Sequence, residues 1–143
     1  MTVNLPAVRK VLFIGMNNPR GDEPFWPSPV GSAGERLWRM ISDAVGWDRE
    51  TFLMRTDRVN LCDGPSFNEE RARARAEEIR AMMQGRRAVI VGEVAVSLLD
   101  GPRVWLQPDG DVVSIPHTSG LNRFYNEPAN RDAVVALLRE VLA

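Results

Sequence analysis

The sequence predicts an α/β fold, a three-layer α/β/α sandwich with a central, mostly parallel sheet. Short apolar runs typical of buried strands, such as residues 10–15 and 88–91, alternate along the chain with segments of helical periodicity. This alternation favours a parallel sheet that is covered by helices on both faces. A chain of 143 residues has the size of one such domain, so residues 1–143 are expected to form a single domain.

The first half of the chain predicts two strands separated by a loop and a helix. Residues 10–15 form the first strand, and residues 16–31, rich in Asn, Pro and Gly, predict a long loop of the kind that is more often functional than idle. Ser32 and Glu35 form a capping box at the start of a helix. Residues 55–62 predict a second, weakly patterned strand. The helix is expected to bury Ala33, Leu37, Met40, Ile41 and Ala44.

The second half predicts three more helices and up to three strands. A capping box at Ser66 and Glu69 predicts a helix to about Gln84, and residues 88–91 predict a buried strand that Gly92 turns into a short helix through Leu99. Residues 103–106 and 112–116 are strand candidates around a turn at residues 109–110. The last helix is predicted to start at Asn126, with Pro128 in its first turn. The expected buried positions of the two long helices are Ala72, Ala76, Ile79 and Met83, and Ala133, Val134, Leu137, Leu138 and Val141.

Composition excludes several classes of protein. The formal net charge of −1 gives no global electrostatic case for nucleic-acid binding. Among the 18 basic residues only Lys10 is not arginine, which fits either genomic base composition or a surface selected for phosphate. The single cysteine, Cys62, excludes an internal disulfide, an all-thiolate zinc site and a four-thiolate iron–sulfur cluster within one chain, and it favours a reducing, cytoplasmic setting. No apolar run approaches the roughly 18–20 residues of a membrane span, and no signal peptide is expected.

Three polar loops are predicted at the carboxyl ends of the strands, where ligands bind in such sheets: residues 16–31, 60–68 and 116–127. His117, the only histidine, follows the apolar strand there; it is either structural or functional. Asn60 lies in a strand-like segment, where Asn is disfavoured. Its amide either caps the strand end or reads the edge of a pyrimidine, which it matches with adjacent donor and acceptor groups.

Other site chemistries find no support. The sequence has no phosphate-binding GxxxxGK[ST] loop, and residues 31–34 (GSAG) do not form a dinucleotide-binding GxGxxG motif. Ser119 lies near a histidine, but no strand–GxSxG–helix elbow supports a hydrolase triad. Asp109 and Asp111 fit a solvated turn better than a metal site, so no metal is expected.

Four segments resemble motifs of the uracil-DNA glycosylase superfamily and occur in that family's order. Residues 13–19 (FIGMNNP) are similar to a strand followed by Gly-x-Asn-Pro or Gly-x-Asp-Pro. Residues 29–37 (PVGSAGERL) resemble the glycine-alanine-glycine helix entrance of the iron–sulfur families, without their cysteines. Residues 59–62 (VNLC) resemble the strand with the base-reading Asn, and residues 117–123 (HTSGLNR) resemble the closing motif. The likeness is greatest to the single-strand-selective monofunctional and mismatch-specific branches.

The resemblance implies an enzyme that hydrolyses the N-glycosidic bond of uracil, or of a related damaged base, flipped out of DNA. It implies no cofactor, and the expected form is a monomer. In this role His117 would donate a hydrogen bond to the uracil O2, and Asn60 would read the base. Phe25 or Trp26 would stack on the base beside Met16.

The resemblance also implies residues for water and for DNA. Three residues separate Gly15 from Pro19 where the family usually has two, so either Asn17 or Asn18 would position the attacking water. Contacts to DNA would come from Ser119, from Leu121 as a wedge, and from Arg123 and Arg20 at flanking phosphates. A non-catalytic relative that binds a nucleobase, nucleotide or nucleic acid is the alternative, which the near-neutral charge favours.

Overall fold

The computed structural model describes residues 10–17, 23–62, 66–93, 95, 99, 105–119 and 122–143. Within these ranges, four strands form one sheet in the order β2-β1-β3-β4, and every neighbouring pair is parallel. The strands are β1 (Val11–Gly15), β2 (Thr56–Asn60), β3 (Ala88–Val91) and β4 (Val112–Ile115). All four therefore end at the same edge of the sheet, which confirms the parallel arrangement predicted from the alternating pattern.

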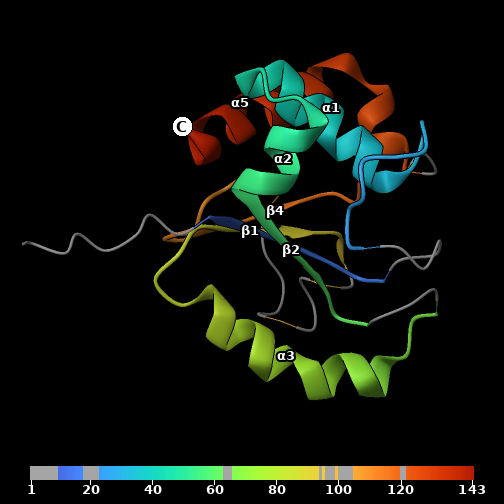
Figure 1. Cartoon of the computed structure of the whole chain (residues 1–143), viewed down its shortest axis with the longest axis vertical. Coiled ribbons are helices and arrows are strands. Elements are labelled where there is room, and N and C mark those ends of the chain that lie inside the picture. Colours follow the sequence, from blue (N-terminus) through green and yellow to red (C-terminus); the bar gives the residue numbers. More distant parts are fainter. Residues whose placement is uncertain are drawn as a thin grey trace, which may run out of the picture.

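Helices cover both faces of this sheet, so the three-layer sandwich is confirmed (Figure 1). One layer holds α1 (Ala33–Val45), α2 (Arg49–Arg55) and α5 (Pro128–Leu142), and α3 (Glu69–Met83) lies on the opposite face. A short 3-10 helix, η1 (Arg123–Asn126), leads into α5. The described residues between β3 and β4 include Glu93, Ala95 and Leu99, which are helical as predicted.

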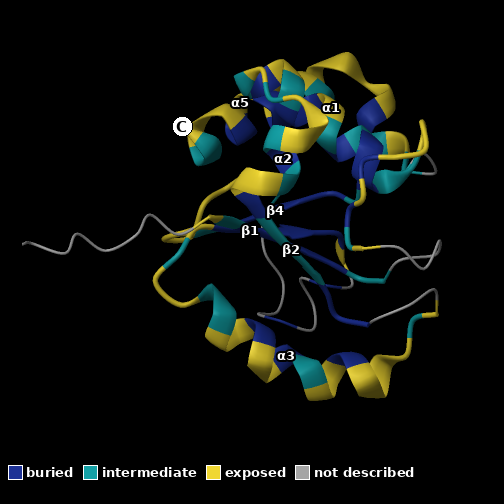
Figure 2. Cartoon of the chain, in the orientation of Figure 1, coloured by how far each residue is buried: buried dark blue, intermediate teal, exposed yellow. Residues whose placement is uncertain are grey.

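The core is divided by the sheet into two clusters, as the buried inner faces in Figure 2 indicate. Phe13 and Val91 pack against the layer of α1, α2 and α5, whereas Leu12 and Ile14 pack against α3. Successive residues of a strand point to opposite faces, so an uninterrupted apolar strand supplies both cores at once. The apolar faces of the helices complete these cores. Helix α3 contributes the buried Ala72, Ala76 and Ile79, with the partly buried Met82 and Met83 packed beside them.

The helix starts follow local capping, with two corrections. The Ser32 hydroxyl accepts a hydrogen bond from the Glu35 amide at 3.2 Å, as predicted. The predicted start at Ser66 is wrong: Asn68 caps α3, and its side-chain oxygen accepts from the Arg71 amide at 3.0 Å. Asn is among the strongest N-cap residues, and it prevailed over the more distant serine. The predicted start of the last helix at residue 126 is also wrong, because that residue belongs to η1 and α5 begins at Pro128.

Three further differences concern burial and element type. Residues 105–106, part of a strand candidate, form a turn, and the Leu106 amide bonds the Ser114 carbonyl without extending the sheet. The short helix α2 was not predicted, since seven residues give too little periodicity to register. On α5, Val135 is buried where Ala133 was expected, because the helix starts later and its inward stripe is set by packing on α1.

The parallel register places the ends of the central strands side by side. Gly15 lies opposite Asn60, and the ladder continues beyond both strands through hydrogen bonds from Leu61 to the Gly15 carbonyl and from Cys62 to the Met16 carbonyl. On the other side, the Gly92 amide donates to the Ile115 carbonyl at 2.9 Å. The segments that follow these strands therefore start from one rigid edge.

Helix α2 offers a matched test of this packing, because Phe52 is fully buried and Met54 is 63% exposed on the same helix. Phe52→Ala leaves a cavity beneath α2 and is expected to lower the free energy of unfolding by about 3–5 kcal/mol. Met54→Ala removes exposed surface and is expected to change it by less than about 0.5 kcal/mol. Urea denaturation followed by circular dichroism measures both values. Equal effects of the two substitutions would contradict the described placement of α2.

Candidate active site

A cleft of about 500 Å³ lies at the carboxyl edge of the sheet. It is lined by residues that directly follow three of the strands: Met16 after β1, Gly92 and Glu93 after β3, and His117 and Ser119 after β4. Phe124 and Trp105 add aromatic surface to it. Ligands of parallel α/β sheets bind at this edge, so the cleft is the candidate active site.

The imidazole of His117 is held as a neutral donor. The Ser119 amide donates a hydrogen bond to His117 Nδ1 at 2.9 Å, which requires a lone pair on that nitrogen and leaves the proton on Nε2. Burial lowers the pKa of the His117 imidazole below its ordinary value, which also favours the neutral form. The ring packs on Gly92, where a Cβ would lie 3.2 Å from His117 Cδ2 and the backbone has a φ of +99°. This contact is tighter than most Cβ contacts, and the positive φ itself favours glycine.

The loop that carries His117 is fixed by three side chains. The Tyr125 hydroxyl donates to the Pro116 carbonyl at 2.6 Å, and the Asn122 amide donates to the His117 carbonyl at 2.9 Å. The Thr118 hydroxyl donates to the Ala33 carbonyl at 2.8 Å, which ties the loop to the first turn of α1. Burial raises the pKa of the Tyr125 hydroxyl, so this donor keeps its proton across the physiological range. The histidine is therefore positioned before any ligand arrives.

A second part of the edge is formed where Asn60 and Phe25 meet above Gly15. A Cβ added at Gly15 would lie 2.5 Å from Asn60 Oδ1 and 2.7 Å from Phe25 Cζ, so only glycine leaves room for this arrangement. Asn60 is 4% exposed, and its side chain makes no hydrogen bond within the described part of the chain. An amide of this kind, beside an aromatic ring, suits a planar ligand with donor and acceptor groups on one edge.

The position of Phe25 is fixed by the close packing of its backbone segment against α1. The φ of Phe25 is +52°, an uncommon value for a residue with a side chain, and the Phe25–Trp26 backbone lies so close to α1 that a Cβ at Gly34 would be 2.2 Å from the Trp26 carbonyl oxygen. Two arginines support the same segment. Arg58 donates to the Pro24 carbonyl at 3.2 Å, and Arg49 donates to the Pro27 carbonyl at 3.1 Å.

The electrostatics of Arg58 reflect this supporting role. Burial lowers the pKa of its guanidinium, and the carboxylates of Glu23, at 3.8 Å, and Asp57 oppose that shift. The guanidinium also lies over the Phe52 ring, 5.7 Å from its centroid. Arg58 therefore connects β2, α2 and the segment that carries Phe25.

The two parts of the site lie at opposite ends of the carboxyl edge of the sheet. Asn60 is the last residue of one outer strand and His117 follows the other outer strand. With strands about 4.8 Å apart, the backbones are separated by about 14 Å. Met16 lines the cleft with His117 and directly follows Gly15, over which Asn60 and Phe25 meet. Asn60 is not itself among the residues that line the cleft. The side chains of Asn60 and His117, with a ligand ring between them, would be needed to span the distance of about 14 Å between the two backbones.

The remaining predicted residues are distributed around this edge. Asn17 is half-buried directly after Met16, and Ser119 lines the cleft. Arg123 is exposed on η1, and Trp26 is 37% exposed beside the buried Phe25. Asn18, Arg20 and Leu121 lie outside the described residues.

Several residues of the edge were not singled out by the sequence. Gly92 was assigned only to a turn, although a glycine directly after a buried strand is a recognisable signal of close approach. Glu93, Asn122 and Phe124 line the cleft, but their positions depend on the course of the loop, for which the sequence carries no periodic signal.

Two negative findings apply to the described ranges. These residues contain no group of three or more His, Cys, Asp or Glu side chains placed to hold a metal ion. None of the helices described is long and apolar enough to cross a membrane.

A comparison with known protein families assigns the chain to one of them. Residues 4–141 match the uracil DNA glycosylase superfamily, and this match spans the sheet, all the described helices and the candidate site. The chain belongs to this superfamily. No curated protein matches the chain. The resemblance to this superfamily is thereby confirmed, and the observed α/β sandwich agrees with it.

The state of the single histidine gives a direct test of the site's electrostatics. Because burial disfavours the imidazolium, the pKa of His117 is expected below its ordinary value of 6.5. The unfolded chain then binds a proton more readily, so the contribution of this group to folding stability is complete above pH 6.5 and is lost as the pH falls below it. Titration by ¹H–¹⁵N NMR should give a midpoint below 6.5 and the Nε2–H tautomer. A higher midpoint, or a proton on Nδ1, would contradict the hydrogen bond from Ser119.

Proposed function

We propose that the protein is a DNA glycosylase that hydrolyses the N-glycosidic bond of uracil, or of a related damaged base, flipped out of DNA. Membership of the superfamily supports glycosylase chemistry in general. The observation that carries the finer assignment is the arrangement at the sheet edge. The Asn60 amide, which makes no hydrogen bond among the described residues, meets an aromatic ring at Gly15, and a neutral imidazole lies at the same edge after β4. We further propose that the protein acts as a monomer on DNA in a reducing, cytoplasmic compartment, which suits its buried free thiol at Cys62.

Base recognition would depend on Asn60 and Phe25. The amide NH2 of Asn60 would donate to uracil O4, and its carbonyl oxygen would accept from N3–H. Cytosine presents an amino group and a bare nitrogen at these two places, so both contacts would be lost and polar groups would be left buried without partners. Phe25 would stack on the base, a contact worth about 1–3 kcal/mol.

Bond cleavage would depend on His117. As the bond between C1′ and N1 breaks, its electron pair moves onto the uracil ring and negative charge develops at O2. The Nε2–H of His117 would donate to that oxygen, and because the imidazole is neutral it would act as a hydrogen-bond donor rather than as an acid. Water then adds to C1′, and the proton that it gives up passes to the uracil anion, directly or through solvent. Asn17 or Asn18 would orient this water, and since an amide is a poor base we expect slow turnover.

A non-catalytic base-binding protein is the alternative, and the net charge of −1 favours it because a weakly charged protein grips duplex DNA poorly. Incubation with uracil-containing oligonucleotides, single- and double-stranded, followed by alkaline cleavage at abasic sites, separates the two. Strand cleavage supports the enzyme. If no strand cleavage occurs at stoichiometric protein, the proposed excision of uracil is wrong and the binding protein is the remaining candidate.

His117→Ala should lower the rate of uracil excision by about 10²–10³-fold, because the developing charge at O2 loses its donor. Binding of the oligonucleotide should change little. His117→Gln is the matched control, since its amide can restore a donor of similar reach and should recover part of the rate. An unchanged rate in His117→Ala would assign the donor to another residue.

Asn60→Asp should shift selectivity toward cytosine. A carboxylate accepts from the cytosine amino group but cannot donate to uracil O4, so excision of uracil should fall and excision of cytosine should become measurable. Single-turnover assays on matched uracil and cytosine oligonucleotides give the ratio of the two rates, and circular dichroism checks that the variant is folded. Uracil selectivity equal to that of the original protein would remove Asn60 as the reader.

A further inference from the structure

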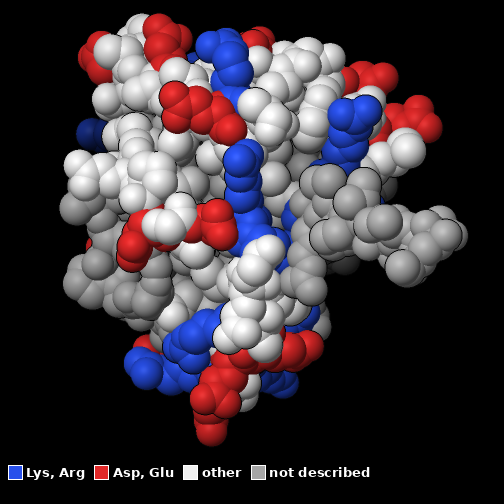
Figure 3. All heavy atoms as spheres, turned by 90° about the vertical axis from the view of Figure 1, so that its left-hand side faces the viewer, with Lys and Arg blue, Asp and Glu red and all other residues white. Residues whose placement is uncertain are grey.

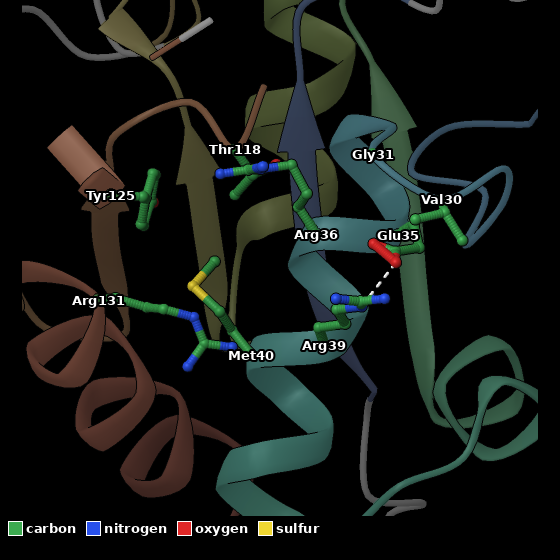
Figure 4. A pocket seen from close by; sticks show the side chains of 9 residues that line it. All are labelled: Val30, Gly31, Glu35, Arg36, Arg39, Met40, Thr118, Tyr125 and Arg131. Carbon is green, nitrogen blue, oxygen red and sulfur yellow. Dashed lines mark ion pairs between the residues drawn. The ribbon is translucent and has the colours of Figure 1, made fainter. Parts of the chain in front are cut away.

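A second cavity, of about 230 Å³, opens beside the candidate site on the layer of α1 and α5. Figure 4 shows three arginine side chains around it, Arg36 and Arg39 from α1 and Arg131 from α5. Glu35, Thr118 and Tyr125 complete the part of the wall that concerns us. Val30, Gly31, Glu35 and Arg36 of this cavity belong to the motif at residues 29–37, Thr118 belongs to the closing motif, and Arg39 and Arg131 lie outside the four motifs.

The charges in this cavity do not cancel. Arg39 Nε lies 2.6 Å from Glu35 Oε1, and the Glu35 side chain is 1% exposed. This ion pair holds the Arg39 guanidinium in place, and the charge of the Glu35 carboxylate is balanced by it. Arg131 pairs with Asp43 at 2.7 Å on the outer side, where both groups are partly exposed and the pair is weak. Arg36 makes no ion pair or hydrogen bond within the described part of the chain. The cavity therefore carries an excess of positive charge with guanidinium N–H groups left to donate.

Arg36 is directed toward the catalytic loop rather than away from it. In Figure 4 its side chain extends across Thr118 toward Tyr125. The positive charge of Arg36 also opposes the raised pKa of the Tyr125 hydroxyl, which indicates that the guanidinium and the phenol are close. A cation in this position, with no carboxylate of its own, suits an anionic ligand.

The cavity and the base cleft share one wall. Thr118 lines the arginine cavity and the preceding residue, His117, lines the cleft. The Thr118 hydroxyl bonds the Ala33 carbonyl, so the shared wall is fixed to the start of α1. The first turn of that helix, which begins beside Gly31 in the cavity wall, adds the positive end of a helix dipole. A ligand that fills the cleft with its base would bring an attached phosphate to this side of His117.

We propose that the cavity formed by Arg36, Arg39 and Arg131 binds a phosphate group, namely a backbone phosphodiester of the DNA strand whose base enters the cleft. This assignment rests on the proposed function, because it takes the base cleft as the reference point. The cavity would bind one DNA strand locally, although the net charge of the whole protein is only −1.

At two other places on the described surface, basic residues lie among acidic ones. On the face that carries the C-terminal end of α5, Figure 3 shows Lys and Arg interspersed with Asp and Glu. On α3, Arg73 is exposed and paired with Glu69 at 2.9 Å. Mixed surfaces of this kind generate little net field, so they are poor competitors for a phosphate.

The test compares two charge-neutralising substitutions. Arg36→Gln removes the unpaired guanidinium from the cavity, and Arg55→Gln removes an exposed guanidinium at the opposite edge of the sheet, directly before β2. Both change the net charge by the same amount. Binding of a single-stranded oligonucleotide with a non-cleavable abasic-site analogue is measured by fluorescence anisotropy over a range of salt concentrations.

Arg36→Gln should weaken binding about ten-fold and lower the slope of log K against log salt by about 0.7, the value for one phosphate contact on a single strand. Arg55→Gln should leave both close to the original values. Equal effects of the two substitutions, or no binding by the original protein, would overturn the proposal. Both variants leave the Arg39–Glu35 pair intact, and circular dichroism checks that each variant is folded.

A second arm distinguishes a strand phosphate from a free one. Inorganic phosphate is titrated while the arginine Nε–H resonances are followed by NMR. Millimolar or weaker binding together with the Arg36-dependent loss of oligonucleotide affinity supports the strand phosphate, whereas tight phosphate binding without that loss would overturn it. Excision activity is scored separately. If DNA binding depends on Arg36 but no base is excised, the proposed glycosylase activity is wrong and the phosphate site is supported. If Arg36→Gln changes neither excision nor binding, the phosphate site alone is wrong.

Discussion

The first turn of α1 holds both halves of the candidate site. The Ala33 carbonyl accepts the hydrogen bond from Thr118 that fixes the His117 loop, and Gly34 receives the backbone of Phe25 and Trp26, where a Cβ would be 2.2 Å from a carbonyl oxygen. Two adjacent residues therefore set the distance between the imidazole and the aromatic ring. A backbone contact cannot be relieved by a rotamer change, so this geometry depends on glycine at position 34. The sheet supplies the edge, but this turn sets how the loops meet on it.

Much of the fold follows from local rules that the sequence exposes. The apolar runs at 11–15 and 88–91 predict strands buried on both faces, and the cap at Ser32 with the apolar stripe through Leu37 and Ile41 predicts α1. The errors arise where two local signals compete or where a local signal is too weak to decide the structure. Asn68 caps α3 in place of the predicted serine, and residues 105–106 form a turn, since the one hydrogen bond from the Leu106 amide to the Ser114 carbonyl does not make a strand.

The site is less predictable than the fold for a physical reason. His117 and Asn60 could be singled out because an unusual residue type stood at a strand end, and the parallel register then brings both to one edge. The arginines of α1 carry no such signal. Arg36 and Arg39 fall on a helix face that composition presents as ordinary surface, and only the packing of α5 and Thr118 turns that face into a cavity. The net charge of the whole chain sums all charged residues, so it does not indicate this local cluster of arginines.

The central claim is that His117 and Asn60 contact one base, and titration with free uracil tests it most directly. The imidazole resonances of His117 and the side-chain amide resonances of Asn60 are followed by NMR in the same samples. The account predicts that both shift with a single dissociation constant, because one ring, contacted from either end by the two side chains, would span the distance of about 14 Å between their backbones. Shifts of only one residue, or two different dissociation constants, would contradict it.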